Sequence, residues 1–291
     1  MNQDIINLYD KFTHGRINRR DFLDRLAELA GSAAAGAALL PLLHCNYAQA
    51  ATVPANDPRL AAERVSYDSP KGKIAGYLVR PKDKAKRPAV IVIHQNRGLN
   101  AHIEDVARRF AIEGFLTLAP DLLSVNGGTP SDDDKARALH QRTSQEDMVV
   151  AAIAAVPYMR HFPESTGKVG AVGFCFGGGV VNRMAAASPD LAAAVAYYGM
   201  PIPADRVPGI KAPLLLHYAE HDDFTNKGIP AYEAALKNSG KRYTIYTYPG
   251  TQHAFNDDTA GIRYNKAAAD LAWNRTLAFL REYLGTPPKA S

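Results

Sequence analysis

The sequence predicts an α/β fold with a doubly wound, mostly parallel sheet and an antiparallel hairpin at its N-terminal edge. Short apolar runs alternate with segments of helical periodicity from residue 64 to residue 283, which is typical of strands joined by helical crossovers. The run 89–94 is apolar up to its final histidine, as expected for a strand buried on both faces. At 169–187 a strand, a glycine-flanked cysteine and a helix follow one another.

The expected elements follow in order along the chain. Strands 64–67 and 74–79 flank a turn sequence, Pro70-Lys71-Gly72-Lys73, so we expect a hairpin there. After strand 89–94, Ile103, Val106 and Phe110 repeat at helical spacing up to Gly114. Residues 122–146 are polar and are expected to form a surface excursion. The remaining predicted elements are strand 115–119, helix 148–159, strand 169–172, helix 180–187, strands 193–197 and 214–217, helix 228–239, strand 243–246 and helix 266–283.

Composition places the chain among globular proteins with one large domain. It has 291 residues, of which 46% are hydrophobic and 22% charged, and its formal net charge is +5. The basic residues are scattered and not interleaved with aromatic ones, so the charge does not indicate a nucleic-acid partner. We expect the main domain at 63–285, a linker at 51–62 and a tail at 286–291.

The first fifty residues have the order of a twin-arginine export signal. Arg19-Arg20 precedes a mildly apolar segment at 29–43, and Ala48-Gln49-Ala50 supplies a small-x-small cleavage pattern. The prediction is cleavage after Ala50 and a periplasmic mature protein without a stable membrane anchor. The Tat export machinery and signal peptidase are then partners of the precursor. The alternative is an N-terminal helix that merely contains two arginines.

Cysteine usage fits an enzyme that needs no disulfide. The chain has 2 cysteines, and cleavage after Ala50 removes Cys45. The remaining one, Cys175, lies in Gly173-Phe174-Cys175-Phe176-Gly177, which is the G-x-S-x-G nucleophile elbow with cysteine in place of serine. A helix N-terminus favours a thiolate. The alternative is a buried structural cysteine.

Two later segments supply an acid and a base. Asp222 follows the strand 214–217, and His253 follows the last strand. Catalytic residues of such sheets lie beyond the carboxyl ends of strands, and the order nucleophile, acid, histidine is that of α/β-hydrolases. Asp223 is adjacent and remains a second candidate for the acid. His253 takes and returns the proton, and the acid orients its imidazole.

Four motifs together resemble the dienelactone hydrolase family, over roughly residues 60–285. They are the runs 93–99 and 114–122, the cysteine elbow, and His253-Ala254-Phe255. The resemblance implies an α/β-hydrolase fold and a triad of Cys175, Asp222 and His253. The backbone N–H groups of Phe176 and Asn96 are expected to form the oxyanion hole.

The sequence departs from the family prototype near the substrate. Gln95 stands where the prototype has a glutamate that pairs with the thiol, so thiolate formation is expected to depend on His253 and the helix terminus. Asn256-Asp257-Asp258 occupies the region where the prototype has an arginine for the lactone carboxylate. We expect these acids to repel an anion, and Arg97 to supply a different cation. Gln95, Arg97 and Phe174 are the predicted substrate-pocket residues.

The predicted function is hydrolysis of a small-molecule carboxylic ester or lactone through a thioester acyl-enzyme. Neither a clustered His/Cys ligand set nor a phosphate-binding glycine loop is evident in the sequence, so no metal or organic cofactor is expected. One alternative is a non-catalytic periplasmic binding protein on a hydrolase scaffold. Another is a thiol peptidase or acyl transferase.

Overall fold

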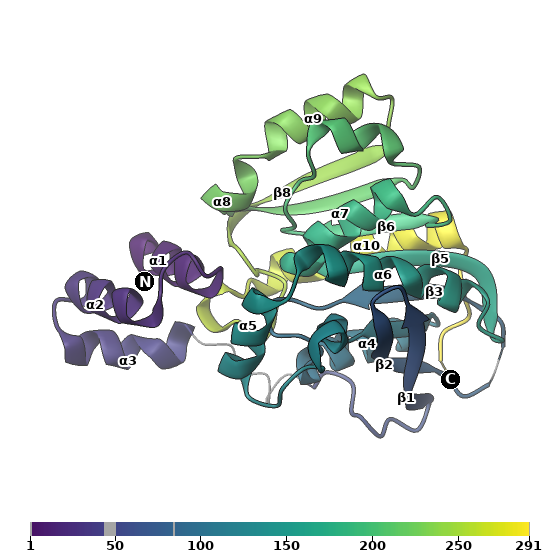
Figure 1. The fold of residues 1–291 in the computed structure, drawn as a ribbon, viewed down its shortest axis with the longest axis horizontal. Coiled ribbons are helices and arrows are strands. Elements are labelled where there is room, and N and C mark those ends of the chain that lie inside the picture. Colours follow the sequence, from purple (N-terminus) through teal and green to yellow (C-terminus); the bar gives the residue numbers. More distant parts are fainter. Residues whose placement is uncertain (1, 44–50, 84, 291) are drawn as a thin grey trace.

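The fold is built on one mixed sheet of eight strands, in the order β1-β2-β4-β3-β5-β6-β7-β8 (Figure 1). It was obtained as a computed structural model that describes residues 2–43, 51–83 and 85–290. Its strands are β1 (Leu60–Ser69), β2 (Gly72–Pro81), β3 (Arg87–Ile93), β4 (Leu116–Pro120), β5 (Ser165–Phe174), β6 (Ala193–Tyr197), β7 (Leu214–His221) and β8 (Tyr243–Gln252).

The predicted hairpin forms the edge of the sheet. β1 and β2 pair antiparallel, with Tyr67 opposite Ile74, and β2 also pairs antiparallel with β4. All other neighbours, from β4 through β3 to β8, are parallel. The carboxyl ends of the central strands therefore meet at one edge, where an active site is expected. The predicted fold class is confirmed.

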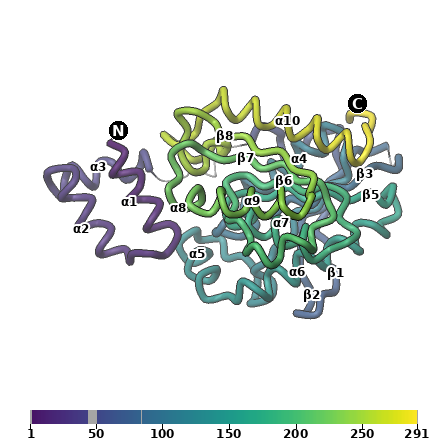
Figure 2. The backbone as a smooth tube through the Cα atoms, turned by 90° about the horizontal axis from the view of Figure 1, so that it is seen from above, coloured from purple at the N-terminus to yellow at the C-terminus, as the bar shows by residue number. Residues whose placement is uncertain are grey.

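Helices cover both faces of the sheet, as Figure 2 shows for α10 and α4 on one side and α7 and α6 on the other. Strand side chains alternate between the faces. Ile91 packs in the cluster under α6, α7 and α9, whereas Val90 and Val92 pack in the cluster under α4 and α10. The covering helices are α4 (Ala101–Ile112), α6 (Gln145–Arg160), α7 (Phe176–Ala187), α9 (Ile229–Asn238) and α10 (Lys266–Leu284).

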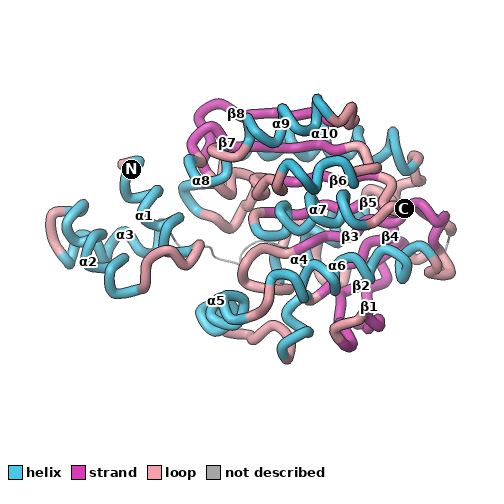
Figure 3. The backbone as a smooth tube through the Cα atoms, turned by 45° about the horizontal axis from the view of Figure 1, so that its top comes forward, coloured by secondary structure: helices cyan, strands magenta, loops and turns pink. Residues whose placement is uncertain are grey.

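The polar excursion contains regular structure (Figure 3). It holds a 3₁₀ turn, η2 (Leu122–Asn126), and a helix, α5 (Asp133–Arg142). Asp132 caps α5 by accepting a hydrogen bond from Lys135 N at 2.8 Å. Within the segment expected to form a surface excursion, Asp132 is thus an N-cap, and Asp133 and Asp134 form an acidic first turn, which the helix dipole favours.

The segments flanking the main domain are also packed against it. β1 begins at Leu60, ahead of the predicted boundary at residue 63. Val53 is buried, and its N–H donates to Asp105 Oδ1 at 2.8 Å. In the C-terminal tail, Pro288 O accepts from Arg87 Nη1 at 2.6 Å.

Residues 2–43 form three helices that lie beside α5 and α8 (Asp223–Asn226) (Figure 1). They are α1 (Gln3–Thr13), α2 (Arg19–Ala30) and α3 (Ala33–Leu43), and they share a small aromatic core that includes Tyr9, Phe12 and Phe22. Arg19 of the twin-arginine pair forms an ion pair with Asp134 of α5 at 2.9 Å. Cys45 and the predicted cleavage pattern at 48–50 lie outside the described residues.

Among these described segments, no single helix has the length and apolarity needed to cross a membrane. Together, α2 and α3 pass that test of length and composition, but they are bent by 110° to one another.

Candidate active site

Cys175 sits on a strained turn between β5 and α7. Its φ of 55° and ψ of −116° lie in a region that non-glycine residues rarely adopt, and such conformations cost about 1–3 kcal/mol and concentrate at functional sites. The flanking glycines permit the turn. A Cβ on Gly173 would lie 2.1 Å from Gly177 O, and one on Gly177 would lie 2.4 Å from Ile93 O. The elbow predicted from the sequence is therefore present in its backbone geometry.

Asp222 and His253 meet across the ends of β7 and β8. His253 Nδ1 lies 2.6 Å from Asp222 Oδ2, and Asp222 Oδ1 accepts from Thr225 N at 3.1 Å. Asp223 is exposed to solvent, so geometry selects Asp222 as the partner of the imidazole. Burial opposes the charge on Asp222, but His253 lowers the pKa of this carboxyl to about 2.

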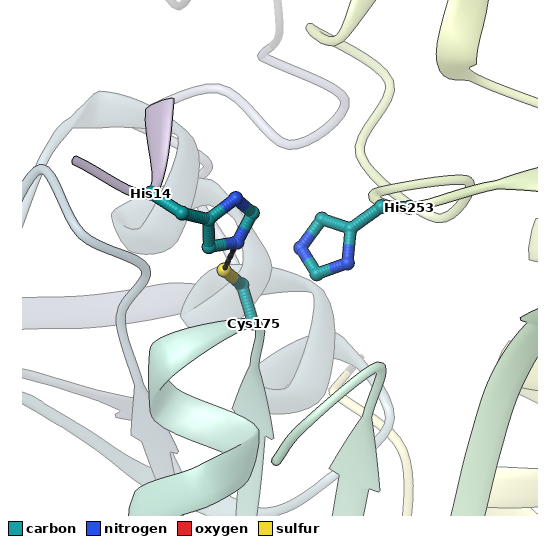
Figure 4. A group of neighbouring side chains, drawn as sticks. All are labelled: His14, Cys175 and His253. Atoms are coloured by element: carbon teal, nitrogen blue, oxygen red, sulfur yellow. Dashed lines mark hydrogen bonds between the residues drawn. The ribbon is translucent and has the colours of Figure 1, made fainter. Parts of the chain in front are cut away.

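Two imidazoles face the thiol (Figure 4). His14 Nε2 lies 3.5 Å from Cys175 Sγ, and one nitrogen of each ring and the sulfur all lie within 4.8 Å of one another. Burial would raise the pKa of Cys175, but the charges of His253 and His14 lower it to about 5. Burial likewise opposes the charge on His253, yet Asp222 and Cys175 raise its pKa well above the usual range. The site is thus arranged to hold a thiolate beside an imidazolium.

The two residues predicted for the oxyanion hole flank the same sulfur. Phe176 is the first residue of α7, and the first N–H groups of a helix have no partner within it. Asn96 follows β3, and its side chain donates to Thr13 O at 2.8 Å. Both residues line the cavity that contains Cys175.

That cavity has a volume of about 780 Å³. Much of its wall is apolar or aromatic, and amide and hydroxyl groups together with Arg183 supply polarity. Its lining residues are Thr13, His14, Gly15, Asn96, His140, Gln141, Thr143, Gln145, Met148, Cys175, Phe176, Gly179, Arg183, Tyr198, Met200, Pro201, Pro203, Phe224, Thr225 and His253.

The three predicted pocket residues need correction, because none of them belongs to this lining. Gln95 is buried and donates from Nε2 to Asp257 Oδ2 at 2.9 Å. Phe174 is buried, and its ring stacks on Tyr197 with a centroid distance of 4.8 Å. Arg97 lines a separate cavity of about 340 Å³, together with Arg19 and the acidic run 131–134.

The acids after His253 also point away from the cavity. Asp257 accepts from Gln95 and from the N–H of Thr259, the latter at 2.9 Å. Asp258 forms an ion pair with Arg109. Both carboxylates therefore serve the loop structure, and the expected repulsion of an anionic substrate has no basis in the lining of the cavity.

Two residues of the site escaped the sequence reasoning. His14 was assigned to an export signal, and its local sequence gives no hint that it reaches Cys175. His140 lies on α5, in the segment read as a surface excursion, and its ring packs on Phe176 with a centroid distance of 4.4 Å. Burial lowers the pKa of His140 to about 4, which keeps it neutral near pH 7. The helical periodicity of α5 was the one sequence signal that could have placed His140 on a helix.

Two groups of side chains could hold a metal ion within the described part of the chain. His14, Cys175 and His253 form one, and His102, Asp257 and Asp258 form the other. The first has the donor types that Zn²⁺ favours, and a metal there would engage the same sulfur that a nucleophile needs. The three residues of the first group come from distant segments, so no spacing in the sequence indicates that they lie together.

The comparisons with known proteins agree with this architecture. The model of the Dienelactone hydrolase family matches residues 74–284, and a second family model, described as YqhI-like, matches residues 1–33. A Saccharolobus solfataricus protein, provisionally named a carboxymethylenebutenolidase, is 32% identical over 257 residues, covering 75% of this chain and 98% of that protein. The protein named usf from Aquifex pyrophilus is 34% identical, covering 76% and 99% respectively.

Solved structures show the same fold. A Klebsiella pneumoniae structure, provisionally named a dienelactone hydrolase, has a TM-score of 0.69 and 27% identity, covering 77% of this chain and 99% of its own. The match of the family model to residues 74–284 spans the sheet from β2 to β8, all but the edge strand β1, and both helical layers. The chain belongs to the dienelactone hydrolase family.

Proposed function

We propose that this hydrolase cleaves a carboxylic ester or lactone through a thioester formed on Cys175. The observation that carries the proposal is the position of Cys175: a strained elbow places its sulfur at the wall of a cavity of about 780 Å³, beside two imidazoles. The thiolate is the nucleophilic form of cysteine, and its pKa of about 5 makes that form dominant near pH 7.

In the acylation step, the Cys175 thiolate attacks the carbonyl carbon and the carbonyl electrons move onto oxygen. The N–H groups of Phe176 and Asn96 stabilise the oxyanion, a contribution of about 10²–10³ in rate for each donor. When the tetrahedral intermediate collapses, the C–O bond to the leaving group breaks. The His253 imidazolium gives its proton to that oxygen, and Asp222 holds the ring in place.

In the deacylation step, water replaces the leaving group. Neutral His253 takes a proton from the water as its oxygen attacks the thioester carbon. Collapse of the second intermediate breaks the C–S bond, releases the carboxylic acid and regenerates the thiolate next to the imidazolium.

The wall of the cavity supports an uncharged or weakly polar acyl group as substrate. Met148, Tyr198, Met200 and Phe224 give it a large apolar surface, and such surfaces select ligands by shape with few polar contacts. Its volume suits a medium-sized ester or lactone better than a long polymer.

The test is a panel of alkyl esters, aryl esters and lactones with the full chain under reducing conditions. We expect turnover that is lost in Cys175→Ala and retained in Cys45→Ser, which is the matched cysteine control. Turnover that survives in Cys175→Ala contradicts the proposal. Ligand binding without turnover in both proteins would instead favour the non-catalytic binding protein. Turnover of amides, or transfer to an added amine, would favour a thiol peptidase or acyl transferase.

Export through the twin-arginine pathway is a separate proposal. It is supported by the arginine pair at 19–20, the apolar segment at 29–43 and the small-x-small pattern ending at Ala50. Cell fractionation with intact-mass measurement tests it. A periplasmic protein beginning at residue 51 is the expected result, and a full-length cytoplasmic protein would contradict it.

A further inference from the structure

The N-terminal helices contact the hydrolase domain around the mouth of the cavity. The contacts involve the end of β8, the 3₁₀ turn at Gly261–Arg263, the loop after β3, helix α5 and the start of α8. They are Gln3 with Gln252 at 2.7 Å, Asp10 with Arg263 at 3.5 Å, Thr13 O with Asn96 Nδ2 at 2.8 Å, Phe12 O with Arg137 Nη1 at 3.3 Å, and the Arg16 guanidinium 3.3 Å above the Phe224 ring. These contacts hold the end of α1 against the reaction centre.

His14 is the C-cap of α1, and its ring is held at both nitrogens. Nδ1 lies 2.7 Å from Asp10 O, which can only accept a hydrogen bond, so Nδ1 carries a proton. The other nitrogen, Nε2, lies 3.5 Å from Cys175 Sγ (Figure 4). The ring also meets His253 edge to face, with centroids 4.9 Å apart. The Asp10 carbonyl thus orients His14 as the Asp222 carboxylate orients His253.

We propose that His14 is a further catalytic residue, which donates a hydrogen bond from Nε2–H to the Cys175 thiolate and holds it in the attacking form. The inference rests on the proposed function, because it assigns a partner to that nucleophile. It also supplies the thiol with a charged partner, which Gln95 does not, because the Gln95 side chain is a neutral amide that is hydrogen-bonded to Asp257.

The charges around His14 support this role. Burial opposes the charge on the His14 ring, but Cys175 and Asp10 raise its pKa, while His253 lowers it by a smaller amount. His140, which also lines the cavity, is kept neutral by burial, and burial raises the pKa of Tyr198 well above the usual range, so its hydroxyl stays uncharged. An imidazolium at His14 therefore has the thiolate as its main counter-charge.

His14 forms part of the wall of the cavity without filling it. The space beside Cys175 remains about 780 Å³ with His14, Thr13 and Gly15 in its lining. A segment that blocked the site would leave no room for an acyl group next to the sulfur. The arrangement therefore favours a catalytic role for His14 over inhibition of the site by this segment. The role belongs to the chain that retains residues 1–43, because a protein cleaved after Ala50 lacks His14.

The experiment compares His14→Asn with His161→Asn in the full chain, both in a Cys45→Ser background. His161 is an exposed C-cap of α6 whose Nδ1 lies 2.8 Å from Pro157 O, four residues earlier, as His14 Nδ1 does with Asp10 O. Asparagine can keep that cap hydrogen bond, but it removes the nitrogen that reaches the sulfur. The measurements are the pH dependence of Cys175 alkylation and the values of kcat and KM for the best ester.

We expect His14→Asn to raise the pH midpoint of alkylation, so that alkylation at pH 5 slows by at least about fivefold. We also expect kcat to fall while KM changes little, and His161→Asn to match the parent. An unchanged midpoint overturns the proposal, even if activity is lost, and so does higher activity in His14→Asn. Because the alkylation midpoint is measured without turnover, it tests the role of His14 even if no ester in the panel is hydrolysed. If His14→Asn folds poorly, His14→Gln gives the same readout.

Discussion

Replacement of Gly177 by alanine tests whether the elbow is as tightly packed as described. In a helix, alanine is favoured over glycine by about 1 kcal/mol. At Gly177, however, the new Cβ would lie 2.4 Å from Ile93 O and 2.6 Å from His94 O, both backbone atoms that cannot rotate away. The start of α7 must therefore move by nearly 1 Å away from β3, within a core that is packed without spare volume.

Gly179 is the matched control in the same helix. There the nearest atom to an added Cβ is Met200 Cβ at 3.6 Å, an ordinary contact. Both variants gain the same helix propensity, and overpacking costs about 1–3 kcal/mol. We therefore expect the free energy of unfolding of Gly177→Ala to be about 1–3 kcal/mol lower than that of Gly179→Ala in guanidinium titrations. Ester turnover should also fall in Gly177→Ala, because the Phe176 N–H moves with the helix. Stabilities within 0.5 kcal/mol of each other, an agreement typical of unperturbed sites, would refute this account of the elbow.

Three further predictions concern charge and metal at the site. Alkylation of Cys175 in the Cys45→Ser protein should have its midpoint near pH 5, and a midpoint above about 8, as for a free cysteine, would contradict the thiolate. Asp222→Asn should destabilise the fold by about 2 kcal/mol. The lowered pKa of Asp222 stabilises the fold above pH 3.8, and the raised pKa of His253 stabilises it below pH 6.5. The decrease in the free energy of unfolding, measured in urea titrations, should therefore be greatest between these pH values and vanish toward pH 2. Zn²⁺ should inhibit turnover by binding to His14, Cys175 and His253, and EDTA should restore the activity. Full activity in saturating Zn²⁺ would exclude that site.

Much of the fold was predictable because its signals are local. The run 89–94, the turn at 70–73 and the elbow at 173–177 each specify a strand, hairpin or sharp turn through residues adjacent in sequence. Helix α5 was missed because its polar composition hid the capping aspartate at its start, Asp132. Helical period is a weak signal when few of the residues are apolar.

The sequence predicted only those site residues whose positions are set by the ends of the strands. Cys175, Asp222 and His253 each follow a strand, and parallel strands bring their carboxyl ends together. Gln95 and Arg97 follow a strand too, but the Gln95 side chain is hydrogen-bonded to Asp257, and Arg97 lines a separate cavity beside the start of α5. His14 reaches the sulfur only because α1 docks on the domain through contacts between distant residues, and no sequence period records such docking.

The most direct test of the central claim is the mass of the acylated protein during turnover of an activated ester, such as an aryl acetate. Rapid acid quench at steady state, followed by peptide mapping, locates the acyl group. We expect an acetyl mass increment on the peptide containing Cys175 that disappears on incubation with hydroxylamine and is absent in Cys175→Ala. Steady turnover with the increment on another residue, or with no covalent adduct under conditions where acylation outruns deacylation, would contradict it.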